Sequence, residues 1–182
     1  MGADAVGAAS AASAASDKRV AEPLIRGVPA ELADHTGFLL SKLGRTTSRR
    51  FAEAMEPFGL DPRRFAVITV LAAHDGVAQQ ELAERLLIHP SSMVAVVDDC
   101  ETAGLLARRR DPADRRRYAI HLTPKGRSVL ARARDAAAAL HREMFAELDA
   151  AEQDELHRLL LRLATTGPLS DLVAQPALSP PA

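Results

Sequence analysis

Hydrophobic residues recur at helical spacing along most of the chain between residues 30 and 166. Leu39, Leu43, Phe51 and Met55 are separated by multiples of four positions. They therefore share one face of a helix, which we expect from about residue 29 to residue 58. Similar spacing, with prolines at helix starts and glycines at their ends, predicts five more helices. These cover residues 62–76, 78–87, 90–104, 124–148 and 150–166.

Between residues 105 and 123 the hydrophobic pattern changes to a period of two, which is typical of β-strands. Within this segment, Asp111-Pro112-Ala113-Asp114 has the composition of a turn. We therefore expect a two-stranded hairpin with a charged tip. Its second strand presents Tyr118, Ile120 and Leu122 on one side and Arg117, Ala119 and His121 on the other.

The composition fits a helical domain with loose ends. The chain has 182 residues, of which 47% are hydrophobic and only 3% are aromatic, which favours a helical protein over a β-sandwich. Neither the Ala/Ser-rich segment 1–29 nor the segment 167–182 has a periodic hydrophobic face, so we expect flexible tails there. The predicted fold is mainly α with a small β-hairpin, in one domain over residues 30–166.

The sequence shows no pattern typical of a redox-active cysteine, a metal site or a membrane span. Cys100 is the single cysteine, and its interior position in a helix predicts a buried, inert thiol rather than a redox switch. The six histidines include no pair at i, i+4 spacing, so we expect no metal and no cofactor. No stretch approaches the roughly 18 apolar residues of a membrane span. The expectation is a cytoplasmic protein that makes no membrane contact.

Positive charge is concentrated in one segment although the formal net charge is −1. Residues 105–127 contain eight basic and two acidic side chains, including the triplets Arg108–Arg110 and Arg115–Arg117. A local cationic patch on an otherwise acidic chain indicates contact with a polyanion at one place. A solvated charged hairpin without a partner is the less favoured alternative.

The helices expected at 78–87 and 90–104 are separated by a very short turn and form a helix-turn-helix candidate. In that motif the start of the second helix enters the major groove of DNA. Its hydroxyls and free backbone N–H groups can bind phosphates or base edges. The acidic residues Asp98, Asp99 and Glu101 would be repelled by DNA, so only the first two turns can dock. We therefore predict DNA contacts from Ser91, Ser92, Met93 and Ala95, and a phosphate contact from Gln79. Simple helix capping is the alternative role for the two serines.

The arginines of the hairpin are predicted to contact DNA beside this helix. Asp114 and Arg116 lie two residues apart in an extended arm, so they point to the same side and can form a bidentate pair. That pair would hold Arg116 in one pose for a narrow minor groove. We expect the other arginines to neutralise phosphates, among them Arg108, Arg110, Arg115 and Arg117.

Three segments resemble the MarR family of bacterial winged helix-turn-helix regulators. "DPADRRRYAIHLTPKG" (111–126) is similar to the wing signature of that family, and "QQELAERLLIHPSSMVAVVDDCETAGLL" (79–106) to its helix-turn-helix. "EPFGLDPRRFAVITVLAAHDG" (56–76) resembles its second-helix region. The resemblance implies a DNA-binding lobe over residues 60–124 and dimerisation helices over 30–58 and 124–166.

The resemblance also implies a function and residue roles. It implies a homodimer that binds a double-stranded DNA operator and a small-molecule effector that releases it, with Arg116 as the minor-groove arginine. The effector crevice is implied between the first, second and fifth helices, where His35, Arg45 and Arg49 are candidate polar groups. Val94 and Ala95 stand where many members have a Thr-Arg pair, which shifts the expected readout toward thymine methyl groups.

Two other classes of function remain as alternatives. A winged-helix module that binds protein rather than DNA would show no steep salt dependence and no sequence preference toward a duplex. An enzyme is disfavoured because the chain has no nucleophile elbow, phosphate loop or paired histidines. The sequence therefore predicts a DNA-binding transcriptional regulator.

Overall fold

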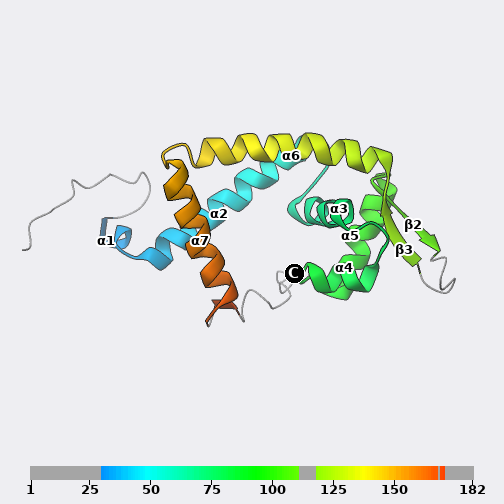
Figure 1. Ribbon diagram of the computed structural model, residues 1–182, viewed down its shortest axis with the longest axis horizontal. Helices are drawn as coiled ribbons and strands as arrows, with labels where there is room; N and C mark the ends of the chain where they lie inside the picture. Colours follow the sequence, from blue (N-terminus) through cyan, green and yellow to red (C-terminus); the bar gives the residue numbers. More distant parts are fainter. Residues whose placement is uncertain (1–29, 111–117, 168, 171–182) are drawn as a thin grey trace, which may run out of the picture. The chain divides into compact units, whose positions relative to one another are not determined.

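The computed structural model describes residues 30–110, 118–167 and 169–170 (Figure 1). The chain divides into two units, Met1–Gly44 and Arg45–Ala182, and each is described by itself. The first unit contains helix α1 (Ala30–Ala33) and the beginning of α2 (Thr36–Met55). The tail predicted over residues 1–29 lies outside the described residues, as do residues 168 and 171–182 of the tail predicted over 167–182.

The single helix expected over residues 29–58 is broken near its start and changes to a 3-10 helix near its end. Asp34 and His35 separate α1 from α2, and both residue types are weak helix formers. A 3-10 helix, η1 (Glu56–Phe58), follows α2, and Gly59 ends it with a left-handed φ of 67°.

The second unit contains the remaining elements in the predicted order. They are α3 (Pro62–Ala73), β1 (Val77–Ala78), α4 (Gln79–Arg85), α5 (Pro90–Thr102), β2 (Leu106–Arg110), β3 (Tyr118–Leu122), α6 (Pro124–Met144) and α7 (Ala150–Thr165). The fold is therefore mainly α with a small antiparallel sheet, as predicted.

Side-chain caps fix the starts of three helices where the sequence placed them. Asp61 accepts a hydrogen bond from the Arg64 N–H at 2.9 Å, and Thr123 accepts one from the Gly126 N–H at 3.0 Å. At α7, Asp149 and Glu152 bond each other's backbone N–H groups in a capping box. Such caps satisfy donors that a helix start leaves unpaired.

The sheet has three strands rather than the two predicted. β3 lies in the middle, and β1 pairs with it through Val77 opposite Ile120. On its other side β3 pairs with β2, with Leu106 opposite Leu122. β1 was missed because a two-residue strand is too short to show an alternating pattern.

One hydrophobic core joins α3, α4, α5, the sheet and the first half of α6. Its largest fully buried side chains include Met55, Ile68, Leu71, Leu82, Met93, Leu106, Ile120 and Leu122. On α6, Leu130 and Ala133 belong to this core. Part of α6, which the family resemblance assigns to the dimerisation helices, is therefore covered within its own chain, whereas α7 has no buried residue.

Gly126 sits where the first turn of α6 touches the end of the α5–β2 connection. A Cβ atom there would lie 2.0 Å from the backbone oxygen of Leu105, a contact that the backbone must move to relieve. We predict that Gly126→Ala lowers the free energy of unfolding by roughly 1–3 kcal/mol, as overpacking does, in urea denaturation. Ser128→Ala, at an exposed position of the same helix, serves as the control. Equal stability of the two variants would contradict the close approach.

Candidate nucleic-acid interface

Helices α4 and α5 form a helix-turn-helix within the second unit. The turn between them is closed by a bond from the Ile88 N–H to the Ala83 oxygen at 3.0 Å. Leu87 adopts a left-handed backbone with φ of 52°, which is unusual for a bulky residue. Its side chain is nevertheless 42% exposed beside the start of α5.

His89 caps the start of α5. Its ring Nδ1 lies 2.8 Å from the Ser91 hydroxyl and accepts the Ser91 N–H at 3.4 Å. Pro90 carries no N–H, so the first two helical positions do not offer the free backbone donors expected from the sequence. Ser91 is exposed and Ser92 is half-buried, which leaves mainly side-chain atoms available to a ligand.

The two faces of α5 differ sharply in exposure. Val94 and Ala95 are exposed, as a contact with thymine methyl groups requires. Met93 is 0% exposed in the core. Its prediction as a DNA-contacting residue is therefore wrong, because helical spacing puts it on the same buried face as Val97 and Cys100.

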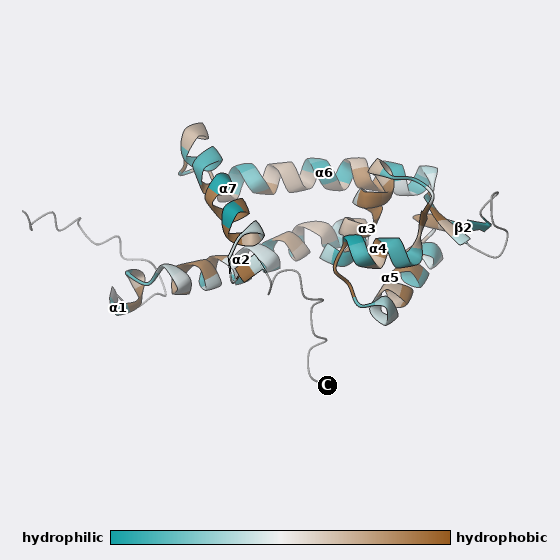
Figure 2. Cartoon of the chain, turned by 60° about the horizontal axis from the view of Figure 1, so that its bottom comes forward, coloured by the Kyte–Doolittle hydropathy of each residue, from teal (hydrophilic) through white to brown (hydrophobic). Residues whose placement is uncertain are grey.

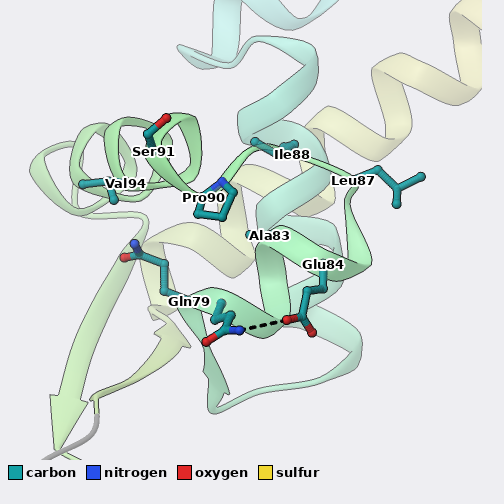
Figure 3. A pocket seen from close by; sticks show the side chains of 9 residues that line it. Gln79, Ala83, Glu84, Leu87, Ile88, Pro90, Ser91 and Val94 are labelled. Atoms are coloured by element: carbon teal, nitrogen blue, oxygen red, sulfur yellow. Dashed lines mark hydrogen bonds between the residues drawn. The ribbon is translucent and has the colours of Figure 1, made fainter. Parts of the chain in front are cut away.

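A shallow hollow of about 490 Å³ lies between α4 and the start of α5. Figure 3 shows the apolar Leu87, Ile88, Pro90 and Val94 and the polar Gln79, Glu84 and Ser91 among the side chains that line it. Gln80 donates to Glu84 at 3.0 Å along α4. The hollow is thus lined by both apolar and polar groups of the helix-turn-helix.

Arg108 of β2 connects the strand to both of these helices. Its guanidinium donates to Gln79 at 3.1 Å, to Asp98 at 2.5 Å and to Glu101. The Arg108 backbone N–H also donates to Glu101, and this bond, with the guanidinium, lowers the pKa of the Glu101 carboxyl. Gln79 and Arg108 were both predicted to contact phosphate, and the structure places them against each other.

A second arginine, Arg64, binds the remaining acidic side chain of α5, Asp99. Arg64 of α3 donates to Asp99 at 2.6 Å, and this bond raises the pKa of the guanidinium. The three carboxylates that were expected only to repel DNA are therefore partners of Arg64 and Arg108 inside the lobe.

The base of the hairpin is anchored by Asp75. Its carboxylate accepts the Leu122 N–H at 3.0 Å and lies 3.1 Å from the His121 ring. Partial burial opposes ionisation, but the His121 and Leu122 hydrogen bonds outweigh it and lower the pKa of Asp75.

The described part of the hairpin exposes two arginines near its tip. Arg109 and Arg110 are exposed, and the Arg110 guanidinium lies 5.5 Å from the centre of the Tyr118 ring. The predicted tip residues Asp114, Arg115, Arg116 and Arg117 lie outside the described residues. The structure therefore neither brings Asp114 to Arg116 nor separates them.

The candidate effector residues fall in different surroundings. Arg49 lines a hollow of about 460 Å³ together with Glu53, Asp61 and Arg64. Arg45 is exposed on α2, and His35 is exposed in the first unit. Of these three residues, Arg49 is thus placed in a hollow of the second unit.

Cys100, the single cysteine of the sequence, lies in the hydrophobic core. Cys100 is fully buried, as predicted, and burial raises the pKa of its thiol to about 11. Within the described ranges, no group of three or more His, Cys, Asp or Glu side chains is placed to hold a metal ion. No helix in that part of the chain is long and apolar enough to cross a membrane.

Comparison with known proteins decides the family. The sequence profile of the MarR family matches residues 58–117. A putative transcriptional regulatory protein for the hcr operon of Thauera aromatica is 35% identical over 137 residues, which cover 75% of this chain and 82% of the relative. The chain belongs to the MarR family.

Two solved structures of the MarR-family regulator CouR have the same fold. CouR from Rhodococcus jostii, bound to p-coumaroyl-CoA, is 30% identical with a TM-score of 0.66, over 77% of this chain and 99% of that one. CouR bound to a 23-mer DNA duplex is 36% identical with a TM-score of 0.65, over 75% and 94%. These MarR-family relatives are transcriptional regulators rather than enzymes.

The residue that sequence reasoning missed at this surface is His89. A cap at that position was readable from Pro90 at the first helical turn, but histidine is an uncommon cap. We predict that His89→Ala lowers the free energy of unfolding by about 0.5–1 kcal/mol, since the Ser91 N–H loses its acceptor. His89→Asn, a preferred cap, should retain the stability in the same urea titration. If His89→Ala unfolds at the same urea concentration as the wild type, the cap contributes nothing.

Proposed function

We propose that the protein is a ligand-responsive transcriptional repressor that binds a pseudo-palindromic double-stranded DNA operator as a homodimer. The observation that carries the proposal is the start of α5, where Ser91, Val94 and Ala95 are exposed while the opposite face is buried. Such a helix can enter a major groove without leaving the core. The DNA-bound CouR structure, at 36% identity, supports this reading.

Base recognition at α5 combines a hydroxyl with apolar groups. The Ser91 hydroxyl offers a hydrogen-bonding group, and Val94 and Ala95 offer methyl groups that can contact thymine. Ser92 is half-buried and therefore contributes less area. We assign sequence preference mainly to Ser91, Val94 and Ala95. Phosphate contacts are assigned to arginines of the hairpin that contains β2 and β3, called the wing below: the exposed Arg109 and Arg110, and Arg115 and Arg117 toward its tip.

Dimerisation is supported by the exposed hydrophobic face of α7. In the single chain Leu160, Leu161 and Leu163 are 40%, 54% and 45% exposed, and Figure 2 shows hydrophobic positions along this helix. Large apolar side chains exposed together on one helix are typical of an interaction site. A second copy of the chain covers it in our proposal, which also presents two recognition helices to two half-sites.

The effector is proposed to bind beside α2 and α3. The hollow that contains Arg49 is also lined by Arg64, whose guanidinium holds Asp99 of α5. An anionic ligand that draws Arg64 away would change the support of the recognition helix. A coupling free energy of about 1–3 kcal/mol would suffice for clear release of DNA.

The function is tested by DNase I footprinting on the DNA upstream of the coding sequence, with the mass measured by light scattering. We expect a dimer that protects two half-sites about one helical turn apart, with affinity falling steeply with salt. Equal affinity for a scrambled duplex would instead favour a protein-binding module. Adding p-coumaroyl-CoA tests whether the effector is a thioester of the kind CouR binds.

The wing is tested separately by Arg116→Ala. If Arg116 enters the minor groove, as the family resemblance implies, its loss should weaken operator binding by roughly tenfold or more, since a specific contact is worth about 1–3 kcal/mol. Helicity and dimer mass should not change. Operator affinity equal to that of the wild type would remove Arg116 from the interface.

A further inference from the structure

Arg108 is held by three side chains from two helices, whereas the next two residues of the hairpin, Arg109 and Arg110, are exposed. Its Nη2 donates to Gln79 at the start of α4 and to Asp98 of α5, and its Nη1 donates to Glu101 of α5. The Glu101 carboxylate also accepts the Arg108 backbone N–H at 3.0 Å. One residue of β2 is thus tied to both helices of the helix-turn-helix.

The register of the sheet explains why Arg108 turns toward the buried face while Arg109, the next residue, does not. Leu106 and Arg108 lie opposite Leu122 and Ile120, which are both buried. Successive residues of a strand point to opposite faces, so Arg109 points away from this face and is exposed. The Arg108 side chain is only 24% exposed.

The charges around Arg108 disfavour a phosphate contact. Two carboxylates, Asp98 and Glu101, surround one guanidinium, so the cluster carries a net negative charge. A phosphate approaching it would have to compete with carboxylates already bonded to the arginine. A guanidinium forms its strongest bonds with such carboxylates at short range.

We propose that Arg108 is a positioning residue that fixes the wing base against the recognition helix α5 and makes no phosphate contact. The inference rests on the proposed DNA-binding function and deepens it. The wing and the start of α5 must reach neighbouring grooves together, so the spacing between them has to be set before DNA binds. Arg108 sets it, because its partners lie on α4 and α5 while its backbone is part of β2.

The same proposal explains why α5 keeps acidic residues close to a DNA-binding surface. Removing carboxylates near DNA strengthens binding in general, since phosphate repulsion falls. For the specific complex, removal of Asp98 and Glu101 should instead weaken binding, because Arg108 loses the partners that hold the wing. The sign of their effect therefore separates positioning from plain electrostatics.

The first arm of the experiment compares Arg108→Gln with Arg109→Gln in the full-length dimer, as operator affinity against salt concentration. We expect Arg108→Gln to lower operator affinity by about tenfold, as loss of a coupled network does, with the slope of log K against log salt unchanged. Arg109→Gln is the matched control on the next residue. It should reduce the slope by about 0.9 per chain, or about 1.8 per dimer, as loss of a phosphate contact does.

The second arm measures the double variant Asp98→Asn, Glu101→Gln on the operator and on a scrambled duplex. We expect affinity for the operator to fall and affinity for the scrambled duplex to rise. The proposal is overturned if operator affinity rises too. A decrease in salt slope for Arg108→Gln equal to that for Arg109→Gln would also overturn it, as would an unchanged operator affinity for Arg108→Gln.

The third arm needs no DNA. Hydrogen exchange of the free protein should be faster in residues 106–110 and 118–122 of Arg108→Gln than in Arg109→Gln, with the thermal midpoint within a few degrees. Equal exchange in the two variants would show that Arg108 does not hold the wing. If the wild type binds no duplex, the proposed function fails, and exchange alone still decides whether Arg108 holds the wing.

Discussion

Burial of one face of helix α5 is the constraint on which the arrangement of α3, α4 and the sheet depends. Met93, Val97 and Cys100 are fully buried against α3, α4 and the sheet, and burying each apolar side chain contributes on the order of 1.5–3 kcal/mol. The opposite face has to stay free to meet a ligand. Because both faces belong to the same turns of one helix, burial of one face in the core fixes which side chains remain outside.

The electrostatics of α5 follow from this division. Its first turn carries no acidic residue, whereas Asp98, Asp99 and Glu101 occupy the second half. Each of these carboxylates has an arginine from another element as its partner: Arg64 from α3 and Arg108 from β2. Exposed ion pairs contribute little stability singly, but several that converge on one helix restrict how it can move relative to the strand and to α3.

Family membership and the local departures from the family concern different levels of the structure. The match to MarR-family proteins covers the fold of the lobe and its class of function. At the start of α5 this chain has Val94 and Ala95, which are exposed. The comparisons therefore concern the scaffold, and the exposed side chains of α5 have to be considered from the structure of this chain.

The sequence by itself determined the features that depend on near neighbours in the chain. Helix starts at Asp61, Thr123 and Asp149 were readable because a cap bonds the N–H three residues later. The hairpin followed from the period of two in the hydrophobic pattern. The cationic segment and the wing signature were equally local, so they indicated the fold and the kind of partner.

Only the tertiary structure decided which of these residues are free to act. The two-residue strand β1 exists because β3 offers it a partner, and Met93 is buried because α3 and the sheet close over that face of α5. Arg108 looks like its neighbours in sequence, yet its partners lie 29, 10 and 7 positions away. Packing between distant segments chooses such partners, and no local pattern of charge or hydrophobicity records that choice.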